Sequence, residues 1–402
     1  MKMIRVAYIL ASYPAPSEMF IRREIDAVRR QGVAIDVYSL RKPTEPEAGV
    51  CYRGDIPAGE KFGAAAWAIG RPVRLASAIG RILAEQFAHP LALAKSLRNV
   101  LTAAAFARRI QRSGAIALHA HFASEPAAVA RTISLLTSLP YTFSVHARDI
   151  FLLEKPSLVG RIRCARAVSA CTFTAFDRVK ELVPADMHDR VHRIPHGIDV
   201  GSIGCSAAVH REPMVMMAGR LVEKKGTPVL LKALALLRDA GRPVPCTILG
   251  DGPERPAIER LIGELGIGNL VRLHGWASPG TVRGWMTQAS VLAVPSIIAR
   301  DGDRDGLPNV ILEAAAAGLP VVASDVGGIR DFIMMDGFCG LLVPPGDPQA
   351  LADATTRLLD DSGLRQKLVE QAQVTLKTEY DAEVNAVRLI DAMGWSCQAV
   401  AP

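Results

Sequence analysis

Two acidic side chains, Asp305 and Glu313, lie on either side of a glycine-containing loop and the start of an expected helix. The segment reads Asp301-Gly-Asp-Arg-Asp-Gly-Leu-Pro-Asn-Val-Ile-Leu-Glu-Ala-Ala-Ala-Ala-Gly-Leu-Pro320. Pro308 suits the first turn of the helix, and Gly318 ends it. A loop that opens a helix directs free backbone N–H groups and the positive end of the dipole at one point, where a phosphate could be held. Glu313 could then accept hydrogen bonds from a ribose diol, and Asp305 could reach a sugar hydroxyl.

Two cations five positions apart, Arg220 and Lys225, form a second candidate group, in Met214-Val-Met-Met-Ala-Gly-Arg-Leu-Val-Glu-Lys-Lys-Gly226. They follow an expected strand and precede an expected helix, Pro228–Leu237. Such a position at the carboxyl end of a parallel strand is where open α/β sheets bind ligands. The two cations could neutralise the charge that develops on a diphosphate leaving group.

The elements that must position these residues are short apolar runs that alternate with helical patterns, which is typical of parallel α/β sheets. The expected strands are Ile4–Leu10, Ile35–Leu40, Ala117–His121, Tyr141–Val145, Met214–Ala218, Cys246–Leu249, Leu270–His274, Val291–Val294 and Pro320–Ala323. Periodicity lapses near Asp199–Arg211. We therefore expect one domain over residues 1–200 and a second over 201–377, with a helix over about 378–402 that packs back on the first domain.

Charge is divided unevenly between the halves. Residues 1–200 contain 28 Lys and Arg against 17 Asp and Glu, whereas residues 201–402 contain 19 against 23. A basic half favours phosphate-rich partners or an anionic membrane face. Within it, Lys61–Arg112 is an Ala-rich, Arg-studded stretch of expected helices with Trp67, Phe87 and Phe106 on apolar faces. These helices either lie on a membrane surface or pack on the sheet with their arginines in water.

Composition excludes several other classes of protein. The seven cysteines include no C-x-x-C pair, so neither a disulfide framework nor a zinc site is indicated, and we expect reduced, cytosolic cysteines. The N-terminal apolar run lacks a small-residue cleavage pattern and is expected to be a first strand rather than a signal peptide. The most apolar long stretch, Gln86–Ala107, contains His89, Lys95 and Arg98, so no transmembrane helix is expected.

The segments around Arg220 and Asp305 resemble glycosyltransferase family 4, the retaining enzymes of the GT-B fold. Asp305 and Glu313 match the family's acid, seven residues, acid pattern, and Arg220 with Lys225-Gly226 matches its Gly-Arg…Lys-Gly loop. Further matches follow in sequence order: Leu249-Gly-Asp-Gly-Pro253, His274-Gly275, Pro295-Ser296 and Gly327-Gly328-Ile329. The resemblance covers residues 214–335 and implies two Rossmann-like domains that face each other across a cleft.

The N-terminal half is similar to bacterial exopolysaccharide glycosyltransferases of the colanic-acid and amylovoran type. The resemblance is carried by Tyr13-Pro-Ala-Pro-Ser-Glu-Met-Phe-Ile-Arg-Arg-Glu24, His119-Ala-His-Phe122, Phe143-Ser-Val-His-Ala-Arg-Asp-Ile-Phe151 and His196-Gly-Ile-Asp199. It implies a polyprenyl-diphosphate-linked glycan as acceptor and a cytoplasmic protein that is peripheral at the inner face of the plasma membrane. No nucleic acid is expected as a partner.

The family resemblance also implies roles for single residues. The donor is a nucleoside-diphosphate sugar, UDP- or GDP-linked, and no cofactor is implied. Glu313 is expected at the ribose, Arg220 and Lys225 at the diphosphate, Asp305 at the donor sugar, and His146 at the transferred sugar. Further donor-binding positions are Gly219, Gly226, Gly252, Gly306, Leu307, Pro308 and Asn309. Ser17 and Asp149 are acceptor-loop candidates, whereas structural roles are expected for His119, His121 and His196.

Asp305 stands where the family usually has Glu, and the side chain is one methylene shorter. Contact with the donor sugar is therefore expected to be shifted or absent. Asp301, Asp303 and Asp305 alternate, but the later ligands of a calcium loop are missing, so no metal is expected.

Two alternatives remain open at this point. A GT-B-fold sugar-nucleotide epimerase would share the architecture without an acceptor, and a membrane-recruited binding protein would keep an inactive donor site. A nicotinamide-dependent dehydrogenase is poorly supported, because Leu249-Gly-Asp-Gly-Pro253 is not the G-x-G-x-x-G of a dinucleotide-binding turn.

Overall fold

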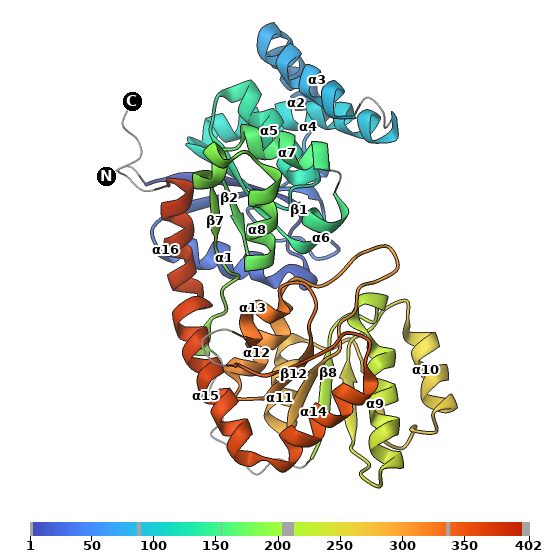
Figure 1. The fold of residues 1–402 in the computed structure, drawn as a ribbon. Helices are drawn as coiled ribbons and strands as arrows, with labels where there is room; N and C mark the ends of the chain where they lie inside the picture. Colours follow the sequence, from blue (N-terminus) through green and yellow to red (C-terminus); the bar gives the residue numbers. More distant parts are fainter. Residues whose placement is uncertain (1–2, 87–89, 154, 203–212, 335–337, 396–402) are drawn as a thin grey trace. The chain divides into compact units, whose positions relative to one another are not determined.

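The chain forms two compact units, each with its own sheet and core (Figure 1). The computed structural model describes residues 3–86, 90–153, 155–202, 213–334 and 338–395. Met1–Gly197 and Ala382–Pro402 make up the first unit, and Ile198–Asp381 make up the second. Phe87, Cys205, Cys397 and most of the expected domain boundary lie outside the described residues. Among the residues that are described, no helix has both the length and the apolar composition that crossing a bilayer requires.

The first unit is built on a parallel sheet in the order β3-β2-β1-β4-β5-β6-β7. The strands are β1 (Arg5–Ser12), β2 (Ala34–Arg41), β3 (Cys51–Tyr52), β4 (Ala117–His121), β5 (Tyr141–Val145), β6 (Ala167–Ala170) and β7 (Val191–Arg193). Both faces are buried, so successive residues of β1 enter different cores: Val6 and Tyr8 pack on one side, Ala7 and Ile9 on the other. Burial on both faces explains why these strands read as apolar runs.

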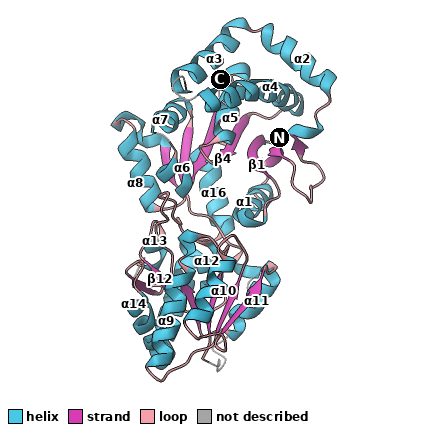
Figure 2. Cartoon of the chain, turned by 90° about the vertical axis from the view of Figure 1, so that its right-hand side faces the viewer, coloured by secondary structure: helices cyan, strands magenta, loops and turns pink. Residues whose placement is uncertain are grey.

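Helices cover both faces of this sheet (Figure 2). They are α1 (Met19–Arg30), α2 (Ala58–Ile69), α3 (Pro72–Gln86), α4 (Pro90–Ser113), α5 (Glu125–Thr137), α6 (Ala147–Leu152), α7 (Lys155–Cys164), α8 (Phe173–Leu182) and α16 (Ala382–Met393). α1 and α16 pack together on one face, while α4 and α5 share the core on the other face. α2 and α3 pack on α4 and thus form an outer layer.

The second unit repeats this architecture in the strand order β10-β9-β8-β11-β12-β13, also all parallel. Its strands are β8 (Val215–Ala218), β9 (Cys246–Leu249), β10 (Val271–Gly275), β11 (Val291–Val294), β12 (Val321–Ser324) and β13 (Leu341–Val343). Its helices are α9 (Thr227–Asp239), α10 (Arg255–Glu264), α11 (Pro279–Gln288), α12 (Asn309–Ala316), α13 (Ile329–Ile333), α14 (Pro348–Asp360) and α15 (Ser362–Glu379). The order turns back at β8, so β8 and β11 are neighbours although two strands separate them in the chain.

All nine expected strands are present, to within about two residues at each end, and the α/β class is confirmed. Four described strands, β3, β6, β7 and β13, were not expected from the sequence. Each has only two to four residues, too few to show a periodic pattern.

Candidate active site

The loop before α12 brings Asp305 into the second unit at the carboxyl end of β11. The sequence predicted Pro308 in the first turn of the helix, but Pro308 is the N-cap because its ψ of 128° is still extended. At the other end the prediction is confirmed. Gly318 has a φ of +68°, and the Gly318 and Leu319 N–H groups donate to the carbonyls of Ala315 and Ala314, which is a Schellman motif.

Asp305 is buried and holds Lys225 directly. Lys225 Nζ donates to Asp305 Oδ2 at 2.8 Å, and Ser296 Oγ donates to the same oxygen at 2.7 Å. A second lysine, Lys224, lies 3.7 Å from Asp305 Oδ1 and 3.1 Å from Asp303 Oδ2. Burial alone would raise the pKa of Asp305, but the Lys225 ammonium, together with Lys224 and Ser296, lowers it below its ordinary value. The two separated sequence motifs therefore meet in one ionised pair.

Arg220 differs from Lys225 in being exposed. Over the part of the chain that the structure describes, its guanidinium has no hydrogen bond or ion pair. Glu313 lies in the second turn of α12 and is half-buried. Gly306, Leu307, Pro308 and Asn309 lead into α12 and are all partly exposed. The free cation and the start of a helix are the features that an anion would use.

Glycines allow the loops after the strands to touch through their backbones. A Cβ added to Gly226, which has a φ of +64°, would lie 1.8 Å from the Pro295 carbonyl oxygen. Gly327, with a φ of +56°, approaches the Asp305 carbonyl oxygen in the same way, at 2.0 Å. Gly252 packs on the backbone of Leu221, next to Arg220, where a Cβ would meet the carbonyl oxygen at 2.4 Å. The glycines of the motifs thus hold the loops that carry Lys225 and Asp305.

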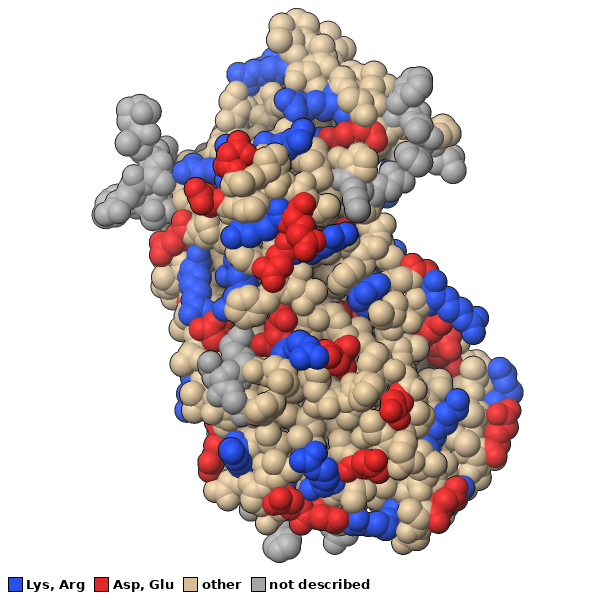
Figure 3. Space-filling model, in the orientation of Figure 1, with Lys and Arg blue, Asp and Glu red and all other residues tan. Residues whose placement is uncertain are grey.

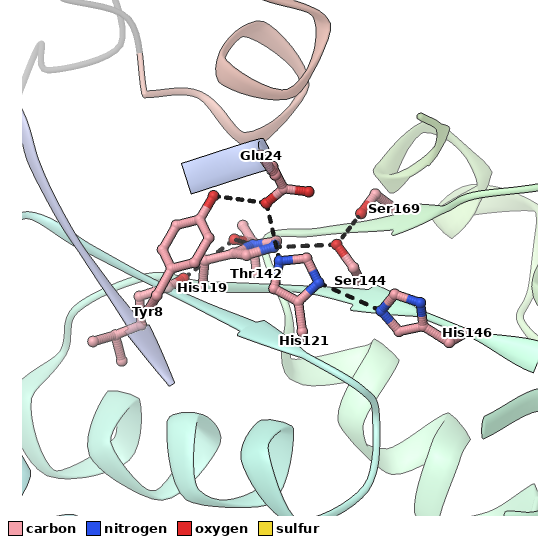
Figure 4. A network of polar contacts seen from close by, with 9 residues as sticks. Tyr8, Glu24, His119, His121, Thr142, Ser144, His146 and Ser169 are labelled. Atoms are coloured by element: carbon pink, nitrogen blue, oxygen red, sulfur yellow. Dashed lines mark hydrogen bonds and ion pairs between the residues drawn. The ribbon is translucent and has the colours of Figure 1, made fainter. Parts of the chain in front are cut away.

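In the first unit, polar side chains at the carboxyl ends of β4 and β5 meet α1 (Figure 4). Glu24 Oε1 accepts hydrogen bonds from Tyr8 Oη and from His121 Nε2, both at 2.9 Å. His121 Nδ1 lies 3.4 Å from His146 Nε2. His119 is separately held by Thr142 and Ser144, at 2.9 and 3.1 Å. His146 is thus one end of a buried network.

His146 also begins α6, where it forms a capping box with Asp149. The Asp149 carboxylate accepts from the His146 backbone N–H at 3.0 Å, and burial raises the pKa of Asp149 to about 6. Asp149 is therefore a buried capping residue in this structure. Ser17, the other acceptor-loop candidate, is exposed in the short 3-10 helix Pro16–Glu18.

Three buried histidines here, His119, His146 and His196, have pKa values below the ordinary range. Burial, reinforced by the nearby His121, lowers the pKa of His119 and of His196 to about 3. Burial and the neighbouring histidines hold the pKa of His146 well below its ordinary range. Glu24 is the anion beside them, because His121 and the hydrogen bond from Tyr8 outweigh its burial and lower its pKa to about 2.

Two groups of possible metal ligands come together in the described part of the first unit. The ligand atoms of Glu24, His119 and His121 lie within 4.8 Å of one another, as do those of His146, Cys171 and His196. The first three already hydrogen bond to protein partners. In the second unit, Asp303 and Asp305 are neutralised by lysines, so that loop is a poor cation site.

Glu24 was not predicted as a site residue. In the sequence it is only the last residue of the motif that begins at Tyr13. A signal was present: Ile21, Ile25 and Val28 are buried in α1, and Glu24 shares their face at helical spacing. A carboxylate on the apolar face of a helix indicates a buried polar partner.

The two parallel, doubly wound units have the architecture of the GT-B fold. Anabaena HepE, solved in complex with UDP, superposes with a TM-score of 0.71 at 17% identity, over 98% of this chain and 100% of that one. The fold expected from the motif resemblance is confirmed.

The sequence comparisons find similarity to glycosyltransferases. Residues 212–361 match the model of the family described as glycosyl transferases group 1. The chain is 27% identical to the putative colanic acid biosynthesis glycosyltransferase WcaL of Salmonella typhimurium, over 87% of this chain and 89% of that protein. It is 32% identical to the amylovoran biosynthesis glycosyltransferase AmsK of Erwinia amylovora, over 44% of this chain and 43% of that protein. Residues 212–361 of this chain are therefore similar to the group 1 glycosyltransferases.

Proposed function

We propose that this chain is a retaining glycosyltransferase of family 4 that transfers a sugar from a UDP- or GDP-sugar to a lipid-linked oligosaccharide in cell-surface polysaccharide biosynthesis. The observation that carries the proposal is the meeting of Lys225, Asp305 and the start of α12 beyond the carboxyl ends of the adjacent central strands β8 and β11. The named roles of WcaL and AmsK support the polysaccharide context.

In this proposal the second unit binds the nucleotide. The exposed Arg220 and the Lys225 ammonium stabilise the negative charge that develops on the diphosphate as the glycosyl bond breaks. Backbone N–H groups at the start of α12 bind phosphate oxygens, and Glu313 binds the ribose. His146 of the first unit acts at the transferred sugar. The leaving phosphate takes the proton of the acceptor hydroxyl on the same face, which retains the anomeric configuration.

The role that we propose for Asp305 differs from that of the longer Glu that the family usually has at this position. Its carboxylate is already engaged by Lys225 and Ser296, which fixes the Lys225 ammonium in place. We therefore assign Asp305 to the positioning of Lys225, and direct contact with the donor sugar is secondary.

A thermal-shift screen of nucleotide sugars tests the donor proposal. A ligand that binds only the native state adds about 2.7 kcal/mol of stability at 100 times its Kd. One UDP- or GDP-sugar is expected to raise the Tm of the purified chain, and the matching nucleoside diphosphate to raise it as well. A screen in which no such compound shifts the Tm would contradict the donor assignment.

The outer helices of the first unit support a membrane-surface location for the acceptor. Phe62, Ile69 and Val73 of the α2–α3 region are 77%, 67% and 82% exposed. The acids of these helices, Glu60 and Glu85, are paired with Arg109 and Arg131. Figure 3 shows Lys and Arg among uncharged residues in the region of these helices. Exposed apolar side chains beside cations suit an anionic lipid surface, where a lipid-diphosphate-linked glycan would be held.

Co-sedimentation with vesicles tests this part of the proposal. At low salt the chain is expected to bind vesicles that contain phosphatidylglycerol and not vesicles of phosphatidylcholine alone, because the attraction is electrostatic. The double variant Phe62→Ser/Val73→Ser is expected to bind several-fold less. Val374→Ser, which changes a 56% exposed apolar residue of α15, is the matched control. Equal binding to both kinds of vesicle, or no binding, would rule the surface out.

A further inference from the structure

The proposed function leaves unexplained why a partly buried carboxylate, Glu24, is linked to His146 through His121. Glu24, on α1, contacts Tyr8 of β1 and His121 of β4, and His121 in turn contacts His146 after β5 (Figure 4). The chain of contacts therefore joins three neighbouring strands and a helix. It also joins three of the N-terminal sequence motifs, those that end at Glu24, contain His121 and contain His146.

The donors and acceptors in this chain can be matched in one way when the histidines are neutral. An ionised carboxylate only accepts, so His121 must carry its proton on Nε2, which leaves Nδ1 as an acceptor. His146 then has to donate from Nε2. The contact with His121 thus requires His146 to carry its proton on Nε2.

The contacts differ in strength along the chain. Both hydrogen bonds to Glu24 are 2.9 Å, whereas the His121–His146 contact is 3.4 Å, the outer limit for a hydrogen bond. His119 cannot substitute for His121, because Thr142 and Ser144 occupy its nitrogens. The long contact is the place where an incoming oxygen can compete for the His146 proton.

We propose that Glu24 is a positioning residue: through His121 it fixes the tautomer and ring orientation of His146, which then offers Nε2–H to an oxygen of the bound sugar. A neutral His146 donor stabilises a hydroxyl or ring oxygen without exchanging protons with it. The carboxylate–histidine pair resembles the outer-shell arrangements that orient histidines elsewhere. The sugar contact rests on the proposed function, whereas the tautomer is a property of the ligand-free protein.

The tautomers can be read by NMR of the ligand-free chain with ¹⁵N-labelled histidine. In the wild type, His121 and His146 are expected in the Nε2–H form. Glu24→Gln keeps the shape but lets an amide N–H point at His121, so His121 should populate Nδ1–H and the His146 signals should change. Asp26→Asn, which removes a carboxylate from the same helix outside the network, should leave both unchanged. A wild-type His146 with its proton on Nδ1, or an unchanged Glu24→Gln spectrum, would overturn the proposal.

Circular dichroism checks that Glu24→Gln is folded. A second variant keeps the proposal testable if Glu24→Gln misfolds. His121→Asn interrupts the series of contacts from Glu24 to His146. The His146 tautomer should then become mixed although Glu24 remains. A His146 tautomer unchanged in His121→Asn also counts against the proposal.

Kinetics separate this inference from the proposed function. With the donor identified by thermal shift, Glu24→Gln should lower kcat about tenfold and leave the Kd of the nucleoside diphosphate unchanged, because the nucleotide contacts belong to the second unit. An unchanged kcat would remove the catalytic part of the inference. If no nucleotide sugar binds at all, the proposed function fails, but the NMR result still decides the tautomer.

Discussion

Lys225→Ala is expected to lower the rate of sugar transfer by a factor of about 100 or more, since groups that stabilise a developing anion typically contribute that much. Lys225 Nζ is held 2.8 Å from Asp305 Oδ2, so the ammonium is fixed before the donor binds. Removing it also leaves a buried carboxylate with only Ser296 and the more distant Lys224. The readout is release of nucleoside diphosphate that depends on the acceptor.

Stability and catalysis can be separated with a second change. Lys225→Ala/Asp305→Asn removes the uncompensated charge and should recover much of the lost Tm, while transfer stays low. Lys232→Ala, an exposed lysine of α9, is the matched control for lost charge. Glu313→Ala should abolish transfer, because it weakens binding of the nucleotide. Full activity in folded Lys225→Ala or Glu313→Ala would disprove these assignments.

The free energy of unfolding is expected to fall steeply as the pH drops from about 6 to 4. His119, His146 and His196 have a folded pKa below the unfolded value of about 6.5, so in this window the unfolded chain binds three protons that the folded chain does not. Each contributes about 1.4 kcal/mol per pH unit. Asp149 acts in the opposite sense, because burial raises its folded pKa to about 6 and folding takes up its proton. The net loss is roughly 3 kcal/mol per pH unit.

Urea unfolding at a series of pH values measures this slope. His196→Phe, which keeps an aromatic ring against Phe20, should reduce the slope by about 1.4 kcal/mol per pH unit. Below about pH 4 the loss continues, because the folded pKa of Glu24 is about 2 and lies below the unfolded value near 4.3. A free energy of unfolding that stays level from pH 7 to 5 would show that these histidines are not held neutral.

Much of the fold could be predicted because its central strands are apolar runs of four or more residues. Ala117–His121, Tyr141–Val145, Cys246–Leu249 and Val291–Val294 have the same bounds in the structure as in the sequence prediction. β6, with the sequence Ala-Val-Ser-Ala, pairs between β5 and β7 but carries no such pattern. Its strand conformation is set by its neighbours and not by its own residues.

The candidate site was predicted as separate motifs and not as a set of contacts. Lys225 and Asp305 are 80 residues apart, and they meet because β8 and β11 are adjacent in the sheet. That adjacency depends on strand order, which local periodicity does not determine. The same limit hid the Glu24–His121 pair, whose partners are 97 residues apart.

Amide hydrogen–deuterium exchange with and without the nucleoside diphosphate chosen by the thermal-shift screen tests the central claim most directly. The nucleotide is predicted to slow exchange in residues 219–226 and 305–316, the two segments that carry Arg220, Lys225 and the start of α12. Residues 58–86 of the outer helices provide an internal reference and should not change. Protection that is confined to the first unit, or no protection by a saturating nucleotide, would contradict a donor site in the second unit.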